Sequence, residues 1–146
     1  GKPVEQKLTT DYAIAIEAIA GGTAQICFMG AQGYIEAHDR NAAVLPLFVN
    51  SGASSTLDDA IYYSWMAVNK GDEVKYEENG AFALTNLEGA RMSFVSNSST
   101  SGFKVPASAV IKFFGATDKW KAIASDDLTE GGGFFSEVLF GGWTWP

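Results

Sequence analysis

The chain has 146 residues, the length of one ordinary domain, and its 47% hydrophobic and 18% charged residues exclude intrinsic disorder. A formal net charge of −7 argues against binding of nucleic acid or anionic membranes by bulk electrostatics. A single cysteine, Cys27, excludes a disulfide within the chain, and 16 glycines with 13% aromatic residues are typical of β-rich proteins.

Residues 1–8 are polar and are predicted to form a tether. Beyond them, four short segments are predicted to be strands, two because their residues alternate in character, as side chains on a strand point alternately to its two faces, and two because they are short apolar runs. The fourth segment contains Pro46, which has no amide donor and therefore places that strand at an edge or a bulge. The four predicted strands are residues 12–17, 25–29, 33–39 and 43–49.

The middle of the chain combines strands with clear turn signals. Residues 50–56 are all small or polar and are predicted to form a loop, and the aromatic segment 61–68 is a strong strand candidate. Lys70-Gly71-Asp72 is predicted to be a structural turn rather than an adhesion tripeptide. Asn79-Gly80 predicts a hairpin between residues 73–77 and 81–85, because both residues tolerate a positive φ. Residues 90–95 form the next predicted strand.

The last third is less regular. It begins with the polar loop Ser96–Gly102 and contains strand candidates at residues 109–114, 120–123 and 134–140. This makes about ten short strands with no sustained helical stripe, a pattern that indicates an antiparallel sandwich or barrel. No domain boundary is visible, so residues 9–146 are predicted to form one all-β domain in which 96–146 is an extension.

Residue constellations with catalytic chemistry are absent from the sequence. It has no phosphate-binding loop, dinucleotide fingerprint, paired-cysteine motif or zinc-protease motif, and only one histidine, His38. The adjacent acids Asp58-Asp59 and Asp126-Asp127 would point to opposite faces of a strand and would not converge on one bond. Turn and cap chemistry accounts for them better than calcium binding. The chain is therefore predicted to be no enzyme and to hold no cofactor and no metal.

Large aromatic residues gather near the carboxyl end, at Trp120, Phe134, Phe135, Trp143 and Trp145. Packing in the core or between subunits is the first interpretation, because large aromatic side chains are normally buried. The alternative is a platform on which a sugar ring stacks.

Several short motifs follow one another in a familiar order. They are Thr10-Asp11-Tyr12, Ala31-Gln32-Gly33-Tyr34-Ile35, Val68 to Val74 with its Lys-Gly-Asp turn, and Met92-Ser93-Phe94-Val95. In this order the sequence resembles the terminal knob domains of bacteriophage fibres and appendages, whose jelly roll is similar to that of C1q and tumour necrosis factor. The resemblance covers residues 10–95. The chain departs from the pattern after Ser96: domains of that family often end soon after a late strand that contains phenylalanine, whereas this chain continues to residue 146.

The resemblance implies an antiparallel jelly-roll β-sandwich assembled as a homotrimer, located on a virion or outside the cell. Such a knob trimerises a fibre, joins other fibre or virion proteins and contacts a glycan or protein of the host surface. The alternatives are a secreted carbohydrate-binding β-sandwich and, with less support, a β-sandwich glycan hydrolase. Neither nucleic acid nor membrane insertion is expected.

Exposed loops and aromatic residues are the candidate contact sites. The residues expected to bind are Ser51, Ser54, Ser55, Asn97, Ser98, Ser99, Trp143 and Trp145, and those expected at the trimer interface are Tyr62, Tyr63 and Trp65.

Overall fold

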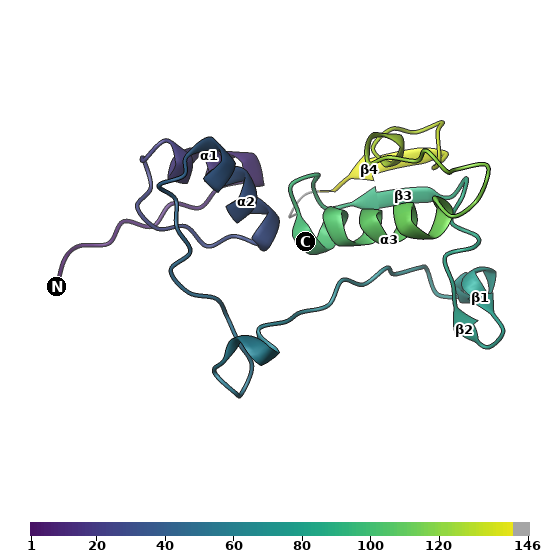
Figure 1. The fold of residues 1–146 in the computed structure, drawn as a ribbon, viewed down its shortest axis with the longest axis horizontal. Helices are drawn as coiled ribbons and strands as arrows, with labels where there is room; N and C mark the ends of the chain where they lie inside the picture. Colours follow the sequence, from purple (N-terminus) through teal and green to yellow (C-terminus); the bar gives the residue numbers. More distant parts are fainter. Residues whose placement is uncertain (142–146) are drawn as a thin grey trace. The chain divides into compact units, whose positions relative to one another are not determined.

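A computed structural model describes residues 1–141 and contains both helices and strands (Figure 1). The α-helices are α1 (Tyr12–Ala20), α2 (Ala31–Arg40) and α3 (Val105–Phe114). Short 3-10 helices are η1 (Leu57–Asp59), η2 (Glu73–Tyr76) and η4 (Asp126–Leu128), and η3 (Thr100–Lys104) is a short π-helix. The strands are β1 (Glu77–Glu78), β2 (Ala81–Phe82), β3 (Arg91–Phe94) and β4 (Glu137–Phe140).

The predicted all-β jelly roll is wrong. Three of the expected strands, residues 12–17, 33–39 and 109–114, lie in α1, α2 and α3. Within residues 1–141 the strands form two small two-stranded sheets, β1 with β2 antiparallel and β3 with β4 parallel. Short apolar runs do not distinguish a strand from a helix by their period alone, and here the tertiary contacts favour helices.

The described residues separate into two compact units. Unit 1 contains residues 1–61 and 98–100, and unit 2 contains residues 62–97 and 101–141. Residues 98–100 therefore belong with α1 and α2, although they lie far from them in the sequence.

Unit 1 is built on the packing of α1 against α2. The side chains of Ile16 in α1 and Ala37 in α2 are buried between them. The side-chain amide of Asn41, just after α2, donates to the Ala20 carbonyl at 2.8 Å and so joins the ends of the two helices. The predicted strands 25–29 and 43–49 have no regular secondary structure, but the rings of Phe28 and Phe48 meet edge to face with centroids 5.6 Å apart.

Unit 2 contains a β3–α3–β4 crossover (Figure 1). Parallel strands need a long connection between them, and α3 lies on that connection. Pro106 in the first turn and Gly115 at the carboxyl cap of α3 are typical of helix ends. The predicted strands 90–95 and 134–140 are thus confirmed in position by β3 and β4, but their pairing is parallel.

The core of unit 2 is largely aromatic. Phe94 of β3 meets Phe103 edge to face with centroids 4.9 Å apart, and Phe134 meets Phe114 at 4.6 Å. This confirms the interpretation of Phe134 and Phe135 as core residues, since both are fully buried. Burial of each such side chain contributes about 1.5–3 kcal/mol. The core residues are Leu87, Phe94, Phe103, Ala107, Val110, Phe114, Ile123, Leu128, Phe134 and Phe135.

Two predicted turns of unit 2 are confirmed. Asn79 and Gly80 have φ values of 54° and 78° and join β1 to β2. Gly71 has a φ of 96°, in the region that favours glycine, as expected of a structural turn at Lys70-Gly71-Asp72. The predicted strands 61–68 and 120–123 have no strand assignment. Among residues 1–141, no helix is both long and apolar enough to cross a membrane.

Candidate functional site

The amino end of α2 carries polar backbone groups with few local partners. Gly30 occupies the N-cap position in an extended conformation and offers no capping side chain. The first amides of a helix have no partner within the helix, and together with the helix dipole they favour a negative charge. The Gln32 amide donates instead to the hydroxyl oxygen of Thr100 at 2.9 Å. Residue 100 is therefore joined to the first turn of α2.

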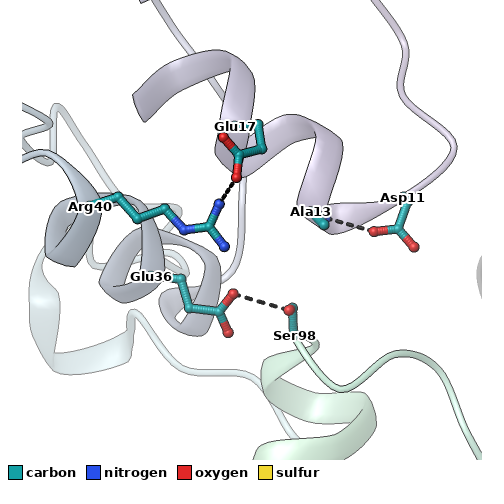
Figure 2. A network of polar contacts seen from close by, with 6 residues as sticks. All are labelled: Asp11, Ala13, Glu17, Glu36, Arg40 and Ser98. Carbon is teal, nitrogen blue, oxygen red and sulfur yellow. Dashed lines mark hydrogen bonds and ion pairs between the residues drawn. The ribbon is translucent and has the colours of Figure 1, made fainter. Parts of the chain in front are cut away.

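A second contact joins the same two segments one helical turn further along. Glu36 accepts hydrogen bonds on both carboxylate oxygens, from the side-chain amide of Gln32 at 2.8 Å and from the hydroxyl of Ser98 at 3.0 Å. Figure 2 shows the Glu36 carboxylate directed at Ser98. All three side chains are half-buried. Ser98, Thr100 and the first two turns of α2 thus form one cluster of hydrogen-bonded polar groups inside unit 1.

Glycine at position 33 allows close packing behind this first turn. Gly33 is buried in α2, and a Cβ added there would lie 3.3 Å from the Cβ of Met29. That is tighter than ordinary van der Waals contact, so a larger residue would displace either the helix or the segment before it. Glycine at position 33 therefore lets Met29 pack closely against the first turn of α2.

Contacts with α1 hold α2 in place (Figure 2). The Asp11 carboxylate caps α1 by accepting from the Ala13 amide at 2.7 Å. An ion pair joins Arg40 of α2 to Glu17 of α1. Both charged side chains are well exposed, so this pair contributes little to stability, and the buried residues Ile16 and Ala37 carry most of the packing energy.

The predicted loop at residues 50–56 folds around the carboxylate of Asp59, three residues beyond its end. The backbone amides of Gly52 and Ser54 donate to Asp59 at 3.1 and 2.9 Å, and the Ser54 hydroxyl donates to it as well. The hydrogen bond from Ser54 holds the pKa of Asp59 below its usual range. Ser51 and Ser55 are exposed, and Ser55 has a φ of 57°. These hydrogen bonds stabilise the loop itself.

The predicted loop Ser96–Gly102 is not a solvated tip. Ser99 is only 4% exposed, Ser98 is half-buried against Glu36, and Asn97 is exposed. Trp143 and Trp145 lie outside the described residues. Tyr62, Tyr63 and Trp65, expected at a trimer interface, belong to unit 2 and are exposed, with Trp65 at 83%. Among the described candidate residues, Ser98 contacts α2 through Glu36, and Ser99 belongs to the same unit.

Gln32, Glu36 and Thr100 were not among the predicted site residues. Gln32 and Glu36 are four residues apart, so they share a face only once this segment is known to be a helix. Thr100 was present only as an unremarked member of the polar loop. Burial raises the pKa of the Cys27 thiol, which disfavours the reactive thiolate.

Comparison with known proteins provides a family. A family model described as "ABC transporter, phosphonate, periplasmic substrate-binding protein" matches residues 1–134, which is most of the chain. Neither the curated proteins nor the solved structures that were compared give a significant match.

This match corrects the functional predictions. The resemblance to a phage knob is wrong, and with it the homotrimeric fibre, the host attachment and the location on a virion. The alternative of a carbohydrate-binding module has no support either. A location outside the cytoplasm agrees in broad terms with a periplasmic family, and a transport family agrees with a chain that is no enzyme. The chain belongs to the family of periplasmic substrate-binding proteins of phosphonate ABC transporters.

Proposed function

We propose that this chain binds a phosphonate for delivery to a membrane permease, and that unit 1 holds the phosphorus oxyanion at the amino end of α2. The observation that carries the proposal is the joining of the Thr100 hydroxyl to the first-turn amide of Gln32, at 2.9 Å. The substrate is bound and released without chemical change, so the chain is not an enzyme. Its partners are a small anionic solute and the permease.

Backbone amides at a helix start suit an oxyanion. They point outward from the helix end, and the helix dipole adds to their attraction for negative charge. Gly30 has no side chain to obstruct an oxygen atom that approaches Ala31. The chain as a whole is acidic, with a net charge of −7, so attraction to an anion has to come from such local dipoles.

The hydroxyl groups beside the helix add donors. A threonine hydroxyl has one proton to donate and two lone pairs to accept. Thr100 accepts from Gln32 through one lone pair, which leaves its proton directed elsewhere. We infer that this proton is donated to the oxyanion when substrate binds. Ser98 and Ser99, which were predicted to bind a ligand, lie in the same segment as Thr100, but in this proposal the donor to the ligand is Thr100 and the ligand is a small anion instead of a host glycan.

Calorimetric titration with methylphosphonate, inorganic phosphate and sulfate tests the proposal. The parent chain should bind methylphosphonate, and Thr100→Val, which keeps the shape and removes the hydroxyl, should raise the Kd about tenfold to a hundredfold, because a hydrogen bond to a charged group contributes about 1.5–3 kcal/mol. Thr85→Val is the matched control, since Thr85 is exposed in unit 2. Absence of any binding by the folded parent chain, or an unchanged Kd in Thr100→Val, would overturn the proposal.

A further inference from the structure

We infer that Glu36 is a positioning residue for the proposed oxyanion site. It does not touch the substrate itself, but it fixes the Ser98–Thr100 segment against α2 and thereby places the Thr100 hydroxyl beside the first-turn amides. The inference rests on the proposed function for its effect on affinity. Its structural part, the anchoring of the segment, stands on contacts present without any ligand.

Two long-range hydrogen bonds place residues 98–100 along one face of α2. Gln32 binds Thr100 through its backbone amide, and Glu36 binds Ser98 through its carboxylate. Gln32 and Glu36 are one turn apart, a rise of about 5.4 Å. The two-residue step from Ser98 to Thr100 spans at most about 7 Å. The two spacings are compatible, so both bonds form together and fix the direction of the segment as well as its position.

The protons in this cluster also define separate roles for the two hydroxyls. The Ser98 hydroxyl has one proton, and the carboxylate of Glu36 can only accept, so the proton of this bond comes from Ser98. Ser98 is therefore spent on Glu36 and is not a donor to the substrate. The side-chain amide of Gln32 is likewise spent on the other carboxylate oxygen. Thr100 accepts a hydrogen bond from the Gln32 backbone amide, so its own hydroxyl proton can be donated to the anion.

A carboxylate close to an anion site needs an explanation, because its charge opposes the charge of the substrate. Glu36 accepts two hydrogen bonds, one from Gln32 of its own helix and one from Ser98 of the segment that it anchors. Rigid placement of polar donors reduces the ordering cost of binding, which is the advantage that offsets the repulsion. What matters at position 36 is then the pair of hydrogen bonds and not the negative charge.

Substitution at position 36 separates these contributions. Glu36→Ala removes both hydrogen bonds and should raise the Kd for methylphosphonate about tenfold. Glu36→Gln should stay within about threefold of the parent, because a hydroxyl and an amide can each exchange donor and acceptor roles and restore both contacts. Asp39→Ala, an exposed acid on the same helix, is the control and should not change the Kd.

A double-substitution cycle tests whether Glu36 acts through Ser98. Ser98→Ala and Glu36→Ala each break the same bond, so the two together should weaken binding by less than the product of the single effects. Independent, multiplying effects would contradict the inference. A Glu36→Gln chain that binds as weakly as Glu36→Ala, or more than about threefold more tightly than the parent, would also overturn it.

Amide hydrogen exchange without ligand keeps this inference distinct from the proposed function. The Gln32 amide, which donates to Thr100, should exchange at least tenfold faster in Glu36→Ala than in the parent, and Glu36→Gln should restore its protection. This result is expected even if the parent chain binds no phosphonate, in which case only the proposed function fails. Unchanged exchange of Gln32 in Glu36→Ala would overturn the positioning role whatever the binding data show.

Discussion

At the scale of single residues, Asp11 decides between a strand and a helix. The alternation of Tyr12, Ile14 and Ile16 predicts a strand, but alanine fills most of the positions between them, and alanine is the best helix former. Asp11 adopts extended backbone angles and its carboxylate accepts from the Ala13 amide. This is the geometry of an N-cap, which satisfies one of the amides left open at a helix start.

We expect Asp11→Ala to lower the free energy of unfolding by about 0.5–2 kcal/mol, because the Ala13 amide loses its partner. Urea denaturation followed by circular dichroism measures the change. Glu5→Ala is the control, since Glu5 is an exposed acid ahead of α1 and should leave stability within about 0.5 kcal/mol of the parent. Equal midpoints for Asp11→Ala and the parent would show that this cap is not needed.

Turns were the most predictable features at this scale. Asn79-Gly80 and Gly71 have the positive φ values that their residue types indicate, because turn chemistry depends on the local backbone alone. Glu36 represents the opposite case. Its partner Ser98 is 62 residues away, so no local pattern could join them. The contacts between α2 and residues 98–100 depend on the fold and could therefore not be predicted from the sequence.

At the scale of elements, α3 shows how a short window misleads. Residues 109–114 alone look like a strand, but the buried positions Phe103, Ala107, Val110 and Phe114 are spaced by four, three and four residues. That is a helical stripe, and it begins upstream in η3. A window that opened at Phe103 would have predicted the helix.

Strand position was easier to predict than strand pairing. β3 and β4 lie inside the predicted strands 90–95, where apolar and polar residues alternate, and 134–140, which is largely apolar. Their parallel pairing follows from the intervening helix, so the error at α3 became an error of fold class. The aromatic segment 61–68 stays outside the ladders, although Trp65 to Asn69 and β3 line one groove of about 680 Å³ within unit 2.

Phe134 is the element-scale position where a substitution should be most costly. Its ring contacts Phe114, Trp120 and Phe135, with centroids 4.6, 5.2 and 4.9 Å away. We expect Phe134→Ala to lower the free energy of unfolding by about 3–5 kcal/mol. The substitution would leave a cavity, and the aromatic rings around it would move little to fill the space. Phe82→Ala, at a side chain that is 76% exposed, should cost less than about 1 kcal/mol. Similar losses in the two variants, measured by chemical denaturation, would contradict the placement of Phe134 in the core.

At the scale of the whole molecule, composition pointed to the wrong class because glycine has several uses. Abundant glycine with aromatic residues is typical of β-rich proteins, but here Gly30 and Gly33 lie at the start of a helix and Gly115 at the end of one. The charge argument remains sound, since an acidic chain has no bulk attraction for polyanions. A small anion does not need bulk electrostatic attraction, because a few oriented backbone amides can bind it.

Ligand binding in unit 1 should also protect the folded chain. A ligand that binds only the native state adds about 2.7 kcal/mol of stability at a concentration of one hundred times its Kd. For a chain of this length, each kcal/mol raises Tm by about 2–4 °C, so methylphosphonate should raise the Tm of the transition that includes α1 and α2 by about 5–10 °C. Potassium chloride at equal ionic strength is the control and should give no comparable shift. In Thr100→Val, a tenfold rise in Kd lowers the stability added by the same methylphosphonate concentration to about 1.4 kcal/mol, so the Tm shift should fall to about half. Equal shifts in the parent and in Thr100→Val would locate the binding away from the amino end of α2.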